Sequence, residues 1–148
     1  MFKNIQVSWI PRQQTGAAIK VFGYYLLKGL KAANTELSQV LEDLEAGRAY
    51  IGVAYELDPF RPIGCWVSDI RILDDNFAFA TVYALSGERL PRWIEQVEVN
   101  VLSWAKENNC SSVRFFGKAA YASLVDDLEI IGKSEDGRAL LFEKRVAA

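Results

Sequence analysis

Two spacings of apolar residues alternate along this chain and separate its expected strands from its expected helices. Residues 77–85 alternate large and small side chains, which predicts a strand covered on both faces, because successive residues point to opposite sides. Between residues 90 and 105 apolar residues recur every three or four positions, which predicts a helix of about five turns. Its apolar stripe is Leu90, Trp93, Ile94, Val97, Val101, Trp104 and Ala105.

The same two patterns divide the rest of the chain. Apolar runs bounded by turn residues predict strands, and Asp136-Gly137 predicts a hairpin turn between the last two. The predicted order is β-α-α-β-β-β-α-β-α-β-β in a single α/β (α+β) domain over residues 1–148. The expected strands are 5–10, 49–56, 63–73, 77–85, 111–116, 129–133 and 138–146, and the expected helices are 15–31, 36–46, 90–105 and 118–128.

The first expected helix, residues 15–31, has apolar residues on more than one side. A helix that is apolar over so wide a surface must be largely covered. Either it lies deep in the domain, or the side formed by Tyr24, Tyr25 and Leu27 contacts another subunit or another protein. We therefore expect a protein partner or a homo-oligomer, with these three residues at the interface.

Composition and charge narrow the class of protein. The 148 residues are 51% hydrophobic and 24% charged, and the net charge is −2 without clusters of Lys and Arg. We therefore expect no nucleic-acid ligand. The sequence holds no run of about 18 apolar residues and no cationic leader, so we expect a soluble intracellular protein without a membrane segment.

Two residue types restrict the chemistry. No histidine occurs, which excludes a Ser-His-Asp triad and a typical zinc site, and no metal is expected. Cys65 and Cys110 lie in or beside apolar segments without a CxxC pair. Two buried free thiols are therefore favoured over a disulfide.

The element order and several short motifs resemble the GNAT acetyltransferase superfamily over nearly the full length. The resemblance implies a central mixed, mostly antiparallel sheet of about seven strands flanked by about four helices. The motifs are also similar to a divergent branch of small GNAT-like proteins of tailed bacteriophages and prophages. Residues 36–55 resemble the second helix and second strand of the superfamily. The likeness to the phage branch is carried by Trp104-Ala105-Lys106, Asn109-Cys110, Arg114, Gly117-Lys118, Tyr121 and Phe142-Glu143-Lys144.

In active members of the superfamily, the turn after the fourth strand reads (Gln/Arg)-x-x-Gly-x-(Gly/Ala), and its backbone N–H groups bind the coenzyme A pyrophosphate. Here residues 86–92 read Ser-Gly-Glu-Arg-Leu-Pro-Arg, which offers one glycine, a proline without an N–H and an acidic residue. Positive side chains can replace the backbone, which makes this turn either a side-chain clamp or an ordinary solvated turn. The expected cofactor contacts are Ser86, Gly87, Arg89 and Arg92.

The resemblance also implies a tyrosine that protonates the departing thiolate, but Val125 stands at its position. Tyr121 lies one helical turn earlier and is the candidate acid, with simple packing of the ring as the alternative. The candidates for a general base that deprotonates an amine are Glu56 and, as alternatives, Asp69 and Glu88.

Three functions follow from these expectations. The first is a phage-encoded GNAT-fold protein with a degenerate site and no cofactor, which acts through protein contacts as a virion or assembly component or a host-interaction factor. It would be found in the host cytoplasm or in the phage particle. The second is an acyl-CoA-dependent N-acetyltransferase with a rearranged cofactor turn, which would use acetyl-CoA. The third is a sensor that binds acyl-CoA without turning it over.

Overall fold

The computed structural model describes residues 4–74 and 77–146. Three α-helices are present in these ranges, α1 (Thr15–Ala32), α2 (Leu37–Ala46) and α3 (Ile94–Glu107), with short 3-10 helices η1 (Arg12–Gln14), η2 (Leu90–Arg92) and η3 (Ala119–Ser123). The strands are β1 (Ile5–Trp9), β2 (Ala49–Glu56), β3 (Arg61–Asp74), β4 (Phe77–Gly87), β5 (Ser112–Gly117), β6 (Glu129–Lys133) and β7 (Leu140–Arg145).

The seven strands follow the order β1-β2-β3-β4-β5-β7-β6 in the sheet. Strand β5 runs parallel to β4, whereas the β1–β2, β2–β3, β5–β7 and β6–β7 pairs are antiparallel. The predicted α/β class and the mixed, mostly antiparallel seven-stranded sheet are therefore confirmed.

Two helix predictions are wrong in detail. The expected helix at 118–128 is only the 3-10 helix η3 followed by turns, so the described chain has one α-helix fewer than predicted. Val125 is the one buried residue among the described side chains of this segment, and so short an amphipathic stretch cannot sustain a helix alone. Asp127 adopts a left-handed φ of 60°, which ends any helical run. Helix α3 begins at Ile94, because residues 90–92 form η2.

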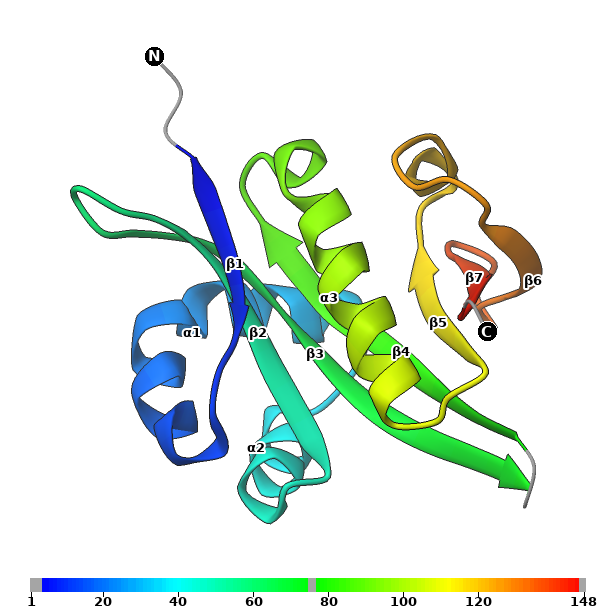
Figure 1. The fold of residues 1–148 in the computed structure, drawn as a ribbon, viewed down its shortest axis with the longest axis horizontal. Coiled ribbons are helices and arrows are strands. Elements are labelled where there is room, and N and C mark those ends of the chain that lie inside the picture. Colours follow the sequence, from blue (N-terminus) through cyan, green and yellow to red (C-terminus); the bar gives the residue numbers. More distant parts are fainter. Residues whose placement is uncertain (1–3, 75–76, 147–148) are drawn as a thin grey trace. The chain divides into compact units, whose positions relative to one another are not determined.

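The described chain divides into two compact units, both of which contain part of β3 and part of β4. The first unit comprises residues 4–69 and 83–93. Its helices α1 and α2 pack against one face of β2 and β3 (Figure 1). The buried residues of this core include Phe22, Leu26, Leu30, Val40, Leu44, Ile51, Val53, Cys65 and Val67.

Helix α1 approaches strand β4 closely in this first unit. A Cβ atom on Gly29 would lie 2.2 Å from the carbonyl oxygen of Ala84, so only glycine fits there. Ala84 itself has a left-handed φ of 55° within the strand. A non-glycine residue in this conformation costs about 1–3 kcal/mol and persists where the surrounding contacts hold it.

The second unit comprises residues 70–74, 77–82 and 94–146. Helix α3 contacts β5, and its buried residues Val97, Val101 and Ala105 follow the predicted apolar stripe. Phe115 of β5 stacks on the fully buried Phe142 of β7 with ring centroids 5.2 Å apart. Cys110 of this unit and Cys65 of the first are both free and buried. Within the described residues no helix combines the length and the apolar character needed to cross a membrane.

Candidate functional site

The candidate site is the turn of residues 86–92, which follows strand β4 in the first unit. Strand β4 ends at Gly87, and Arg89 then adopts a left-handed backbone conformation with φ 56° before η2 begins. A non-glycine residue is strained in this conformation, which therefore persists only where surrounding contacts hold it.

Two backbone N–H groups of this turn, and that of Trp93 just after it, donate to carbonyl oxygens within the protein. The N–H of Glu88 donates to the carbonyl of Ile63 at 2.9 Å, which extends the sheet by one residue. The N–H groups of Arg92 and Trp93 donate to the carbonyls of Arg89 and Leu90 at 2.9 and 3.0 Å. Pro91 has no N–H. Glu88, Pro91 and Arg92 therefore offer no free backbone N–H group to a phosphate.

Gly87 is required here for packing. A Cβ atom on Gly87 would lie 2.6 Å from the carbonyl oxygen of Ile63 and 2.8 Å from Cζ2 of Trp93. Gly64 on β3 is equally crowded, because its Cβ would lie 2.7 Å from the same Trp93 atom. The Trp93 indole is fully buried, and its Nε1 donates to the Glu88 carbonyl at 2.8 Å. The two glycines and the indole together fix the start of the turn.

The Glu88 side chain is held by two partners. Nη2 of Arg61 lies 3.0 Å from Oε2 of Glu88, and the Tyr25 hydroxyl donates a hydrogen bond to the same carboxylate. Burial raises the pKa of Tyr25, and the charge of Glu88 raises it further. These contacts offset the negative charge of Glu88. From the sequence alone, this charge would be expected to repel an anionic ligand.

Glu56 lies beside Arg89 at the same end of the unit. Its side chain is only 5% exposed, and its Oε1 lies 3.9 Å from Nη1 of Arg89. This Oε1 is buried and has no hydrogen-bond partner. A buried carboxylate oxygen without a donor costs about 1–3 kcal/mol or more, so the pair is incomplete as it stands. The Arg89 side chain is 46% exposed and therefore accessible to a ligand.

The predicted site residues are only partly brought together. Glu56, Ser86, Gly87, Glu88 and Arg89 lie in one unit around the turn, where Ser86 is buried. Arg92, which is exposed, belongs to the same turn.

The alternative base Asp69 lies elsewhere. It pairs with Ala49 in the β2–β3 register, whereas Arg61 pairs with Glu56. These two pairs are seven residues apart along β2, or about 23 Å at roughly 3.3 Å per residue. Asp69 therefore cannot act at the same place as Glu56 or Glu88.

The expected interface residues separate into two groups. Tyr24 and Leu27 are 70% and 53% exposed. Tyr25, also on α1, is partly buried, packs beside the core and hydrogen-bonds Glu88. We therefore assign it to the candidate site at the 86–92 turn. Sequence analysis missed Tyr25 and Arg61 as site residues, because neither lies near the turn in sequence.

Tyr121 belongs to the second unit and lies in η3. Its ring covers Gly117, where a Cβ atom would lie 2.3 Å from Cδ2 of Tyr121, and it lies 6.4 Å from the Phe115 ring. Burial raises the pKa of Tyr121. The hydroxyl therefore stays protonated at neutral pH, which an acid requires, although the ring also packs as an ordinary core aromatic.

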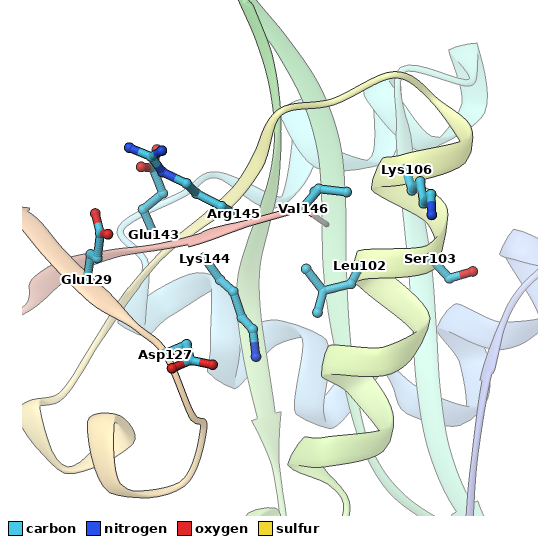
Figure 2. Close-up of a pocket in the computed structure, with 9 residues that line it drawn as sticks. All are labelled: Leu102, Ser103, Lys106, Asp127, Glu129, Glu143, Lys144, Arg145 and Val146. Atoms are coloured by element: carbon cyan, nitrogen blue, oxygen red, sulfur yellow. The ribbon is translucent and has the colours of Figure 1, made fainter. Parts of the chain in front are cut away.

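A pocket of about 520 Å³ in the second unit is lined by both charge signs (Figure 2). Two of its charges are already paired, because Lys144 binds Glu98 and Glu143 binds Arg114 at 2.8 Å. Its walls come from three separate segments, so no local motif could reveal it. The lining residues are Leu102, Ser103, Lys106, Asp127, Glu129, Glu143, Lys144, Arg145 and Val146. Across the described residues there is no cluster of three or more potential metal ligands.

Comparison with protein-family models and with curated protein sequences gives no match. Solved structures do match over nearly the whole chain. A GNAT family N-acetyltransferase, YhbS from Escherichia coli in complex with CoA, aligns with a TM-score of 0.65 at 15% identity and covers 99% of this chain and 84% of its own. A GNAT family acetyltransferase from Staphylococcus aureus aligns with a TM-score of 0.60 at 14% identity over 97% of this chain and 100% of its own. The chain has the GNAT fold.

A further protein with this fold is similar over the same length. FeeM, an N-acyl amino acid synthase from uncultured soil microbes, aligns with a TM-score of 0.70 at 11% identity and covers 99% of this chain and 92% of its own. At such identities the likeness extends to the GNAT fold only. None of the three is described as a phage protein, so the comparisons give no support to the expected phage branch.

Proposed function

We propose that this protein is an acyl-CoA-dependent N-acyltransferase whose 86–92 turn holds the cofactor through side chains. The observation that carries the proposal is the Arg89–Glu56 pair. A strained, half-exposed arginine lies next to a buried carboxylate whose Oε1 lacks a hydrogen-bond donor. Strain and an incompletely satisfied buried charge are costs that proteins retain at functional sites.

The charges of the turn suit a diphosphate. Arg89 and Arg92 are the two exposed cations of the 86–92 segment. Glu88 lies just before them, directly after the end of β4, and its negative charge is offset by contacts with Arg61 and Tyr25. Two guanidinium groups can bind phosphate oxygens by charge-assisted, bidentate hydrogen bonds, which makes backbone donors unnecessary. The residues present therefore fit the pyrophosphate of coenzyme A by a side-chain route.

The remaining predicted roles concern protons. Bound acyl-CoA supplies an activated thioester, from which the acyl group passes to an amine. An amine is largely protonated at neutral pH and must lose a proton to attack, and the unfilled oxygen of Glu56 is the proposed acceptor. Tyr121 lies in the second unit, and its role as the proton donor to the leaving thiolate stays a prediction from the sequence.

Calorimetric titration with acetyl-CoA tests the proposal directly. We expect micromolar binding by the unaltered protein and loss of binding when Arg89 and Arg92 are both changed to Ala. The matched control removes two exposed cations of α1, Lys20→Ala with Lys28→Ala, and should bind normally. Absence of binding at millimolar acetyl-CoA, or equal loss in the control, would overturn the proposed site. Thiol release in the presence of amines would then establish transfer.

A second candidate is a role through protein contacts, which the exposed side chains of α1 favour. Val21, Tyr24 and Leu27 are spaced by three residues and are 47%, 70% and 53% exposed. Changing both Tyr24 and Leu27 to Ser should alter the mass of an assembly without loss of fold, if this face is an interface. An unchanged mass in sedimentation would contradict it. Carriage in a phage particle remains a prediction from the sequence motifs.

A further inference from the structure

We propose that the exposed side of helix α1 lies on the surface of a membrane that contains anionic lipids. The residues of this side recur every three or four positions along the helix, and all of them are exposed, so they form one face. This outer face of α1 consists of Lys20, Val21, Tyr24, Leu27, Lys28 and Lys31. The inference is independent of acyl transfer, because none of these residues belongs to the proposed cofactor site.

The charge on the outer face of α1 has one sign. Lys20 precedes its apolar residues along the helix, and Lys28 and Lys31 follow them. The whole of α1 contains no aspartate and no glutamate. Within the described residues, none of the three ammonium groups has an ion-pair partner. The face therefore carries a local positive charge, although the net charge of the chain is −2.

The apolar side chains between the lysines suit the boundary between lipid headgroups and acyl chains. Val21, Tyr24 and Leu27 remain 47%, 70% and 53% exposed. The Tyr24 ring packs edge-on against Tyr25, with ring centroids 5.3 Å apart. Tyrosine combines an apolar ring with a polar tip, which is why it is enriched at membrane interfaces. Lysine stems can lie along the same apolar surface while the ammonium groups reach the headgroups.

Charge complementarity selects the occupant of this face. A second copy bound through the same face would bring the lysines of both helices together without any carboxylate to compensate them. Anionic headgroups supply the opposite charge, and they can move laterally to meet each lysine. A helix that lies on a membrane needs only such a basic, amphipathic face. The proposal therefore agrees with the finding that none of the described helices could cross a membrane.

Co-sedimentation with lipid vesicles tests the charges. Vesicles of phosphatidylcholine and phosphatidylglycerol in equal parts should bind the protein at low salt, and pure phosphatidylcholine vesicles should bind it far less. Lys20→Ala with Lys28→Ala should weaken binding roughly 25-fold, since each lysine near an anionic surface contributes about five-fold. The matched control, Lys106→Ala with Lys133→Ala, removes two exposed cations of the second unit and should bind normally. Absence of binding to the anionic vesicles, or equal loss in both variants, would overturn the proposal.

The apolar side chains provide a second test that leaves the lysines in place. Tyr24→Ser with Leu27→Ser should weaken binding to the anionic vesicles several-fold at an unchanged melting temperature. Val99→Ser is the control, because Val99 is 67% exposed on α3 and should make no difference. Sedimentation without vesicles distinguishes a protein partner. Self-association that the Tyr24 and Leu27 substitutions abolish would assign this face to a second copy and exclude the membrane.

Discussion

Glu56 and Glu143 are two carboxylates with little exposed side-chain surface, one in each unit, and they differ in the hydrogen bonds that they accept. The Glu143 side chain is 12% exposed and accepts hydrogen bonds from Nε of Arg114 at 2.8 Å and from the Ser112 hydroxyl at 3.1 Å. The Glu56 side chain is 5% exposed, its arginine is 3.9 Å away and its Oε1 has no donor.

The difference separates a structural ion pair from a candidate site. The arginine that binds Glu143 is itself held, because its guanidinium lies 4.4 Å from the Phe79 ring centroid and 5.3 Å from that of Phe77. Such a cation–π contact stabilises one geometry of the side chain. Arg89 has a half-exposed side chain on a strained backbone, which leaves it able to bind a ligand.

The largest effect should come from a substitution that introduces a new carboxylate into the core, where it would have no partner. Val101 of α3 is 1% exposed among apolar residues, so Val101→Asp buries a charge without any donor. We expect the second unit to unfold, measured as loss of the cooperative thermal transition. Val99→Asp is the matched control, because Val99 is 67% exposed on the same helix and should tolerate the charge. A stable Val101→Asp protein would show that the assigned core is wrong.

Removing the satisfied carboxylate should cost stability. Glu143→Ala leaves Arg114, which is 22% exposed, and the Ser112 hydroxyl without their acceptor. We expect the free energy of unfolding to fall by about 3 kcal/mol, at the lower end for a broken buried pair, in a urea titration. Glu143→Gln keeps an acceptor for Ser112 and should lose less. Equal stability of the Ala variant would remove the contrast with Glu56.

Replacing Glu56, whose Oε1 has no hydrogen-bond donor, should affect the rate of acyl transfer more than the stability of the fold. Glu56→Gln removes a buried charge that has no full set of donors, so we expect a change in unfolding free energy below about 1 kcal/mol. If Glu56 is the base, acyl transfer should fall by about 10²-fold or more with acetyl-CoA affinity nearly unchanged. Stopped-flow thiol release and calorimetry measure the two quantities. A large stability loss without loss of rate would make Glu56 a structural residue like Glu143.

The smallest effect concerns the offset charge of Glu88. Arg61→Ala removes its cationic partner, and the uncompensated carboxylate should weaken acetyl-CoA binding by about 1 kcal/mol, or roughly five-fold. Adding Glu88→Gln removes the charge and should restore the affinity. The double variant therefore distinguishes electrostatic repulsion from damage to the fold. Failure of rescue would show that Arg61 acts by packing or by direct contact with the ligand.

The strands and long helices were predictable because each depends on a local pattern. The alternation predicted as a strand at 77–85 appears in β4, and the apolar stripe predicted as a helix at 90–105 appears from Ile94 onward in α3. The segment 118–128 was predicted as a short helix, but only η3 and turns are found there. It fails because one buried residue supplies too little packing to fix a helix of that length.

The site was predictable only as a turn. Residues 86–92 stand out because they lack the full set of glycines of the coenzyme A turn. The sequence suggests that the side chains of Arg89 and Arg92 replace the backbone donors. The contact between Glu56 and Arg89 depends on how the end of β2 and the turn after β4 are aligned across the sheet, and no local pattern encodes that alignment. The same holds for Tyr25 and Arg61, which reach Glu88 from α1 and β3.

The packing of Trp93 on Gly64 and Gly87 gives this turn an evolutionary signature of its own. Because any side chain at either glycine would collide with the backbone of the neighbouring strand as well as with the indole, both glycines should be retained wherever this packing is retained. Relatives that share the rearranged turn should therefore be recognisable by this distant glycine–glycine–tryptophan triplet. A search for the glycine spacing of the acetyltransferase turn would overlook them.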